Sequence, residues 1–248
     1  MSGIAIVSGG SRGIGAATST LLATGGWDVV VGYRRQVQAA QAVAARCRSI
    51  GSRAIALEVD VSSEDAVTRF FTTVDRELGA PRALINCAGI VGPKARLDEF
   101  TAARIHLMFS VNVLGSFLCA REAVLRMSSA YGGTGGSIVN VSSAASRLGS
   151  PGEYIDYAAS KGAIDTMTIG LAREVATEGI RVNAVRPGLV NTDIHASGGQ
   201  PDRVERLAPL VPMGRGAEAE EVAQAIVWLC SDSASYVTGS LIDVSGGR

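Results

Sequence analysis

A tyrosine and a lysine stand four residues apart in the segment Tyr157-Ala-Ala-Ser-Lys161. On a helix, this spacing puts a phenol and an ammonium on the same face. The face continues through Ile164, Thr168 and Leu171, so the pair heads a mostly apolar stripe. Burying an unpaired ammonium is costly, and the pair therefore predicts acid–base chemistry. Acid–base work near pH 7 calls for a phenol pKa roughly 2–3 below its usual value of about 10, and a nearby ammonium would contribute to that lowering.

The same spacing also fits a tyrosine packed in a core beside a lysine whose ammonium reaches solvent. Tyr154 lies nearby, but no lysine follows it four residues later, so Tyr157 is the stronger candidate acid.

Two serines and an asparagine are further candidates. Ser142 and Ser143 follow an apolar run, where a hydroxyl could hold a carbonyl oxygen or could cap a loop. The apolar spacing before Asn112 places its amide on an inward face, and a buried amide needs partners. Asn112 could hold a water that leads to Lys161, or it could simply brace its helix.

A glycine-rich turn follows the first apolar run, with the sequence Ser-Gly-Gly-Ser-Arg-Gly-Ile-Gly over residues 8–15. Between a strand and a helix, such a turn brings backbone N–H groups close to a pyrophosphate with no Cβ in the way. We therefore predict a dinucleotide site here, with a purely structural turn as the alternative.

Arginines stand where many dinucleotide-binding chains have an acid. The second predicted strand ends in Gly-Tyr-Arg-Arg over residues 32–35, with no carboxylate for the ribose hydroxyls. Arg12, Arg34 and Arg35 instead favour a 2′-phosphate, and hence NADP(H) over NAD(H), although the last two could belong to a solvated helix start. Asp60, after the third predicted strand, could accept from an adenine amino group or cap the next helix.

Short apolar runs alternate with longer helical patterns along the chain. This alternation predicts an α/β fold, a Rossmann-type doubly wound parallel sheet of about seven strands with helices on both faces. We expect a single domain over residues 1–248, with an irregular segment at 191–216 acting as a lid. The predicted strands are 4–7, 29–33, 53–59, 83–86, 137–141, 180–186 and 241–244, and the predicted helices are 13–25, 36–51, 63–79, 101–129, 156–178 and 218–231.

Composition narrows the class of protein. The chain has 248 residues, with 23 Lys and Arg against 23 Asp and Glu, and 47% of its residues are hydrophobic. These values exclude a disordered chain and argue against a nucleic-acid binder. No apolar run approaches the roughly 20 residues that span a bilayer, and we recognise no signal peptide, so we expect a cytoplasmic protein without membrane contact. We predict no metal site, and reduced core thiols at Cys47, Cys87, Cys119 and Cys230.

Together these segments resemble the short-chain dehydrogenase/reductase family, in its single-domain branch, over essentially the whole chain. Glucose 1-dehydrogenase-like and 3-oxoacyl reductase-like members are similar to it. The matching segments are 8–15, Asp60-Val61, 86–89, Asn112, 138–143, 157–161, Pro187-Gly188 with Thr192, and 236–239.

The resemblance implies that Tyr157 is the general acid/base and that Lys161 is its electrostatic partner and a ribose ligand. It also implies that Ser143 orients the substrate and that Asn112 supports a proton-relay water. With the arginines above, the expected cofactor-binding set is Gly9, Ser11, Arg12, Gly13, Ile14, Gly15, Tyr33, Arg34, Arg35, Asp60, Val61, Asn86, Ala88, Gly89, Tyr157, Lys161, Pro187, Gly188, Val190 and Thr192.

Two departures from the family pattern stand out. Cys87 replaces the usual second Asn of its loop, and the stretch from Ser143 to Tyr157 is about one residue longer than in many relatives. The resemblance thus predicts an NADP(H)-dependent oxidoreductase that interconverts a carbonyl and a secondary alcohol on a small molecule, as a homotetramer. The alternative is a catalytically silent NADP(H)-binding sensor or regulatory protein.

Overall fold

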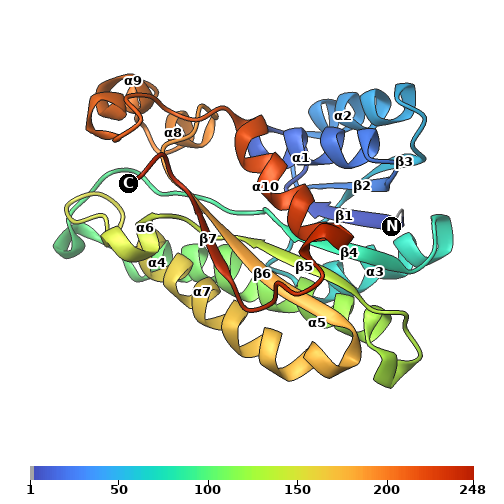
Figure 1. Cartoon of the computed structure of the whole chain (residues 1–248). Coiled ribbons are helices and arrows are strands. Elements are labelled where there is room, and N and C mark those ends of the chain that lie inside the picture. Colours follow the sequence, from blue (N-terminus) through green and yellow to red (C-terminus); the bar gives the residue numbers. More distant parts are fainter. Residues whose placement is uncertain (1–2) are drawn as a thin grey trace.

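Seven parallel strands form one sheet in the computed structural model, which describes residues 3–248 (Figure 1). The strands are β1 (Ile4–Ser8), β2 (Asp28–Tyr33), β3 (Ala54–Glu58), β4 (Pro81–Asn86), β5 (Gly136–Val141), β6 (Ile180–Pro187) and β7 (Leu241–Val244). Their order across the sheet is β3-β2-β1-β4-β5-β6-β7. Every residue of β1 is buried, as expected for a strand covered on both faces. The predicted doubly wound fold is confirmed.

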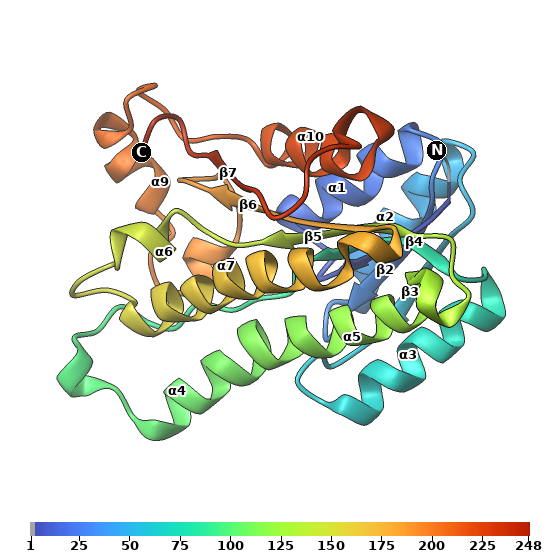
Figure 2. The same cartoon turned by 60° about the horizontal axis from the view of Figure 1, so that its bottom comes forward.

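Helices cover both faces of this sheet. They are α1 (Gly13–Thr24), α2 (Val37–Ser49), α3 (Glu64–Glu77), α4 (Ala102–Phe109), α5 (Gly115–Met127), α6 (Ala145–Leu148), α7 (Ile155–Val175), α8 (Ile194–Ser197), α9 (Arg203–Leu207) and α10 (Ala219–Cys230). Figure 2 shows α1, α2 and α10 on one face and α3, α5 and α7 on the other. Each face has its own apolar core against the sheet.

Short helical turns join these elements. They are the 3₁₀ turns η1 (Leu97–Glu99), η3 (Ser129–Tyr131), η4 (Ala176–Glu178), η5 (Ala208–Leu210) and η6 (Asp232–Ala234), and the π-helical turn η2 (Ser110–Leu114).

The predicted helix over 101–129 is interrupted by η2, so α4 and α5 are separate α-helical pieces of one run. This run, Ala102–Met127, is long and apolar enough to cross a membrane, contrary to the expectation that no segment approaches that length. It packs against β4, α3 and α7 within the fold, and a single helix of this kind is weak evidence for a membrane span.

We had expected the segment 191–216 to be irregular, but part of it is helical. It contains α8, α9 and η5, and it lies beyond the carboxyl ends of the strands (Figure 1). Two backbone hydrogen bonds close its base, from Asn191 N to Ala217 O at 2.8 Å and from Ala217 N to Leu189 O at 2.8 Å. The segment is therefore a folded element held at both ends.

The strand order reverses next to β1, whose neighbours are β2 and β4. In open parallel sheets, ligands bind outside the carboxyl ends of the strands at such a point. The register pairs Ser8 with Asn86 and Asn86 with Asn140, which brings the polar ends of three strands together there.

Candidate active site

A cavity of about 900 Å³ runs along the carboxyl ends of the strands. All the site residues predicted from the sequence line it except Gly15, Asn86 and Asn112. Within residues 3–248, no three His, Cys, Asp or Glu side chains are grouped closely enough to hold a metal ion.

The glycine-rich turn lines this cavity where α1 begins, after β1 and between the ends of β2 and β4. Gly9 has a φ of +67°, and a Cβ there would lie 2.8 Å from the Cα of Ala88. Gly13 has a φ of +51°, and its Cβ would lie 3.1 Å from Cγ2 of Thr192. The chain therefore approaches the cavity as bare backbone at a helix N-terminus, which fits a pyrophosphate.

Gly15 serves packing instead of lining the cavity. A Cβ there would lie 2.3 Å from the carbonyl oxygen of Gly9, so only glycine lets the first turn of α1 close against the loop.

Asn86 does not lie open beneath the cavity as predicted, because its side chain is used inside the protein. It is 4% exposed, and its Nδ2 donates to Asn140 Oδ1 at 3.0 Å and to Ser116 O at 3.2 Å. Ser8 Oγ holds the following loop by accepting from Cys87 N and Ala88 N, each at 3.2 Å.

Cys87 is a wall of the cavity and not a core thiol, in contrast to the three other cysteines, which are buried. Burial raises the pKa of the Cys87 thiol to about 11, so the side chain stays a neutral thiol at pH 7. The replacement of the usual asparagine thus leaves an inert, weakly polar surface at this point.

Charged side chains line the cavity near Tyr33, at the carboxyl ends of β2 and β3. Arg34 Nε contacts Asp60 Oδ2 at 2.9 Å, while Arg12 and Arg35 are exposed. Asp60 Oδ1 accepts from the backbone N of Ser62 at 3.0 Å, and the helix cap of α3 is Ser63. The helix-cap interpretation of Asp60 is therefore wrong, and its carboxylate is bound to a loop and an arginine.

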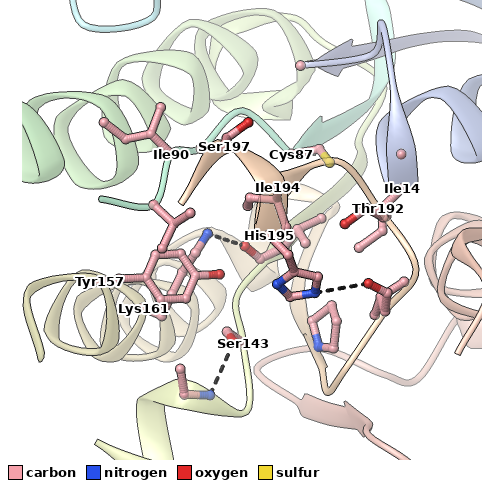
Figure 3. Close-up of a pocket in the computed structure, with 18 of the residues that line it drawn as sticks. Ile14, Cys87, Ile90, Ser143, Tyr157, Lys161, Thr192, Ile194, His195 and Ser197 are labelled. Carbon is pink, nitrogen blue, oxygen red and sulfur yellow. Dashed lines mark hydrogen bonds between the residues drawn. The ribbon is translucent and has the colours of Figure 1, made fainter. Parts of the chain in front are cut away.

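Tyr157 and Lys161 lie one turn apart on α7 and both line the cavity (Figure 3). Lys161 is 6% exposed, its Nζ donates to the carbonyl oxygen of Val141 at 2.7 Å, and it lies 5.6 Å from the centre of the Tyr157 ring. The Ser143 hydroxyl accepts from Ala145 N at 3.1 Å and lies close enough to the Tyr157 hydroxyl to lower the pKa of this phenol. The structure thus brings together three of the four predicted catalytic side chains.

The pKa of Tyr157 lies above its ordinary value in the protein alone, whereas the predicted lowering includes the effect of a nicotinamide ring. Burial causes this rise, and the nearby Ser143 hydroxyl opposes it only in part. Burial also lowers the pKa of Lys161 to about 8. The sequence shows the spacing of the two groups but not how far the fold removes them from water, and this burial is the largest cause of both pKa shifts.

Ser142 points away from this group. Its hydroxyl donates to Asp165 Oδ1 at 2.6 Å, and the other oxygen of Asp165 accepts from Arg186 at 2.9 and 3.0 Å. Of the two serines, only Ser143 lies close to the Tyr157 hydroxyl.

Asn112 sits behind the cavity, fully buried in η2. Its Oδ1 accepts from Ile90 N at 2.8 Å, and its Nδ2 lies 3.0 Å from Ile90 O and 3.1 Å from Ser160 Oγ. The side chain therefore braces the loop after β4. A Cβ on Gly89 would lie 3.4 Å from Asn112 Oδ1 and 3.6 Å from Lys161 Nζ, so glycine keeps the space between the two groups clear.

A polar network that the sequence did not reveal ties segment 191–216 to the loop before α7. Arg203 NH2 contacts Glu153 Oε2 at 2.7 Å, and its guanidinium carbon lies 5.1 Å from the Tyr154 ring centre. Gln200 donates to the Tyr154 hydroxyl. Tyr154 is thus an anchor for the segment, and burial raises its pKa above the ordinary value.

The remaining wall of the cavity is mostly apolar, with one imidazole in it. Ile90, Leu148, Ile194 and Leu207 line it together with His195 (Figure 3 shows Ile90, Ile194 and His195). No spacing in the sequence signals this wall, because its residues come from four segments that meet only in the fold.

Comparisons with known proteins identify the family. A sequence profile described as enoyl-(acyl carrier protein) reductase matches residues 9–248. An uncharacterized oxidoreductase of Escherichia coli strain K12, YgfF, is 57% identical over 245 residues, which cover 99% of both chains. The chain belongs to the short-chain dehydrogenase/reductase family. A solved mutant short-chain dehydrogenase/reductase of Serratia marcescens has a TM-score of 0.90 and 30% identity, and the match covers 98% of this chain and 96% of that one.

Another relative in this family has a more specific name. The cis-4-hydroxycyclohexanecarboxylate dehydrogenase of Sinomonas cyclohexanicum is 39% identical over 98% of this chain and 95% of its own. The predicted family is confirmed, and the protein is a short-chain dehydrogenase/reductase enzyme, an oxidoreductase.

Proposed function

We propose that this enzyme interconverts a carbonyl and a secondary alcohol of a small molecule, with NADP(H) as its cofactor. The observation that carries the proposal is the phenol of Tyr157, which lines the same cavity as Ser143 and has the ammonium of Lys161 one helical turn away. The cofactor would bind along the same cavity. The residues that would hold it are the glycine-rich turn, with Ile14, and Val61, Pro187, Gly188, Val190 and Thr192.

The side chains then have distinct tasks in reduction. A bound reduced nicotinamide would supply the hydride. Ser143 holds the carbonyl oxygen, and Tyr157 donates its proton to that oxygen as negative charge develops there. The raised pKa of Tyr157 keeps the phenol protonated at pH 7, ready for this step. Lys161 then stabilises the phenolate, and a water between Asn112 and Lys161 would return a proton.

The preference for NADP(H) rests on charge at the end of β2. No carboxylate stands at that end, and Arg12 and Arg35 are exposed beside the cavity. Arg34 is bound to Asp60, so the other two arginines are the better partners for a 2′-phosphate.

The setting of the site follows the same proposal. The chain would act as one NAD(P)-binding domain in the cytoplasm, with segment 191–216 as the substrate lid. The exposed apolar side chains of the helical run Ala102–Met127, among them Leu107, Leu114 and Phe117, favour assembly through this run into a homotetramer.

A turnover panel tests the chemistry. Purified enzyme is given NADPH or NADH with a set of ketones and aldehydes, and in the reverse direction alcohols with the oxidised cofactors. We expect turnover with NADPH and a dissociation constant for NADPH at least about tenfold below that for NADH, because charge-assisted hydrogen bonds are strong. Tyr157→Phe should lower kcat by about 100-fold or more while NADPH still binds.

Tyr236→Phe is the matched control, because Tyr236 is fully exposed. Equal turnover by wild type and Tyr157→Phe would overturn the assigned acid. NADPH binding without turnover across the whole panel would favour a silent binding protein.

A further inference from the structure

His195 presents a single hydrogen-bond acceptor to the cavity. The ring belongs to α8, and its Nε2 lies 3.0 Å from the carbonyl oxygen of Val190. A carbonyl oxygen only accepts hydrogen bonds, so Nε2 carries the hydrogen. In a neutral imidazole the other nitrogen, Nδ1, then has a free lone pair.

The ring is neutral at pH 7. Burial lowers the pKa of His195 below its ordinary value, the contact with Val190 opposes the shift, and the charge of Arg203 adds to it. No residue in the described range 3–248 forms a hydrogen bond with Nδ1. Figure 3 shows the ring inside the cavity, with this nitrogen turned to the side on which Tyr157 lies.

The surroundings of the ring make the acceptor selective. The lining of the cavity includes the apolar side chains Ile90, Leu148, Ile194 and Leu207, and the charged Arg203, which forms no hydrogen bond with the ring, also lies on it. When a substrate displaces water from the cavity, Nδ1 of His195 loses its hydrogen bond to water. If the substrate offers no donor in exchange, this loss costs free energy. A substrate that brings its own donor avoids that loss.

We propose that His195 sets substrate specificity by accepting, at Nδ1, a hydrogen bond from a hydroxyl close to the reacting carbon. The substrates are then hydroxy ketones and the corresponding diols, with an apolar remainder against the cavity wall. This inference rests on the proposed function, because Tyr157 marks the place of the reacting oxygen.

Matched substrate pairs test the role of His195. With NADPH, the enzyme is given 3-hydroxybutan-2-one against butan-2-one, and 2-hydroxycyclohexanone against cyclohexanone. We expect a higher kcat/KM for the hydroxylated member of each pair. His195→Phe and His195→Leu should each lower that preference by about threefold to tenfold, mainly through KM, and leave the plain ketones unaffected.

His106→Phe is the control, since His106 is the other histidine of the chain and lies exposed on α4. The dissociation constant of NADPH is measured in every variant and should not change. A change there would assign His195 to the cofactor and overturn the proposal.

The two proposals fail in different ways. If wild type turns over these compounds without preferring the hydroxylated ones, or if the preference survives in both His195 variants, the role of His195 is wrong while the oxidoreductase function stands. If wild type turns over nothing in the pairs or in the wider panel, the proposed function is wrong, and the inference falls with it.

Discussion

Lys161 is a charged residue that the fold largely buries. The residue is 6% exposed, its amine donates to one backbone carbonyl, and burial lowers its pKa to about 8 from an ordinary value of 10.5. Below pH 8 the folded protein therefore carries a buried ammonium at a cost. Between pH 8 and 10.5 the folded protein releases this proton before the unfolded chain does, so this group makes stability rise with pH over that window.

Lys161→Met should stabilise the cofactor-free protein at pH 7 and lose most of that advantage by pH 10. The variant and the wild type differ in their free energy of unfolding, and this difference should shrink by about 2–3 kcal/mol from pH 7 to pH 10, at 1.36 kcal/mol per pKa unit. Urea unfolding at several pH values measures it.

Lys94→Met supplies the comparison, because Lys94 is the other lysine of the chain and its side chain is 55% exposed. If the difference in the free energy of unfolding between Lys161→Met and wild type does not change with pH, burial does not destabilise the ammonium of Lys161.

Spacing alone predicted the Tyr157 and Lys161 pair, and the order of motifs predicted the glycine-rich turn. The sequence did not predict the direction of the shift in the Tyr157 pKa, because this shift depends on burial. It also missed the link from Arg203 to Glu153 and Tyr154, since these residues lie some 50 positions apart and meet only through segment 191–216.

At the scale of elements, η2 shows why a helical pattern does not fix a helix. The apolar spacing over 101–129 fits one α-helix, yet five residues adopt π geometry. Asn112 binds both backbone groups of Ile90, and these bonds hold its side chain against the loop after β4. Functional sites often use such π turns, and a distant backbone partner leaves no trace in local periodicity.

Segment 191–216 depends on Arg203 for its position. The guanidinium is nine-tenths buried, pairs with Glu153 and contacts Tyr154. Arg203→Ala would leave the Glu153 carboxylate without this partner and loosen the segment. We expect thermolysin to cleave within 191–216 about tenfold faster, and KM for the carbonyl substrate to rise more than kcat falls.

The control for this change is Arg215→Ala, because Arg215 belongs to the same segment but pairs with Glu221 at the surface. Unchanged proteolysis of Arg203→Ala would mean that the apolar contacts of the segment are enough to hold it.

At the scale of the whole molecule, the helical run of α4 and α5 is apolar on two sides. One side packs on the sheet and α7, while Leu107, Leu114 and Phe117 are each about half exposed on the outside. Phe117→Glu should therefore reduce the mass of the assembly, because a charge in a paired apolar surface is costly.

Light scattering coupled to size-exclusion chromatography measures that mass. Leu210→Glu is the control, since Leu210 is equally apolar and exposed but lies in segment 191–216. A wild-type protein that elutes as a monomer would overturn the proposed assembly.

Thr192 stands at the start of segment 191–216 and lies against Gly13 of the glycine-rich turn. The segment proposed to bind the carbonyl compound therefore begins next to the turn proposed to bind the nucleotide. Catalysis should therefore follow a compulsory order, in which the nucleotide enters first and leaves last. In the direction of reduction, NADP⁺ would then be a competitive inhibitor against NADPH only. The alcohol product would be a noncompetitive inhibitor against NADPH.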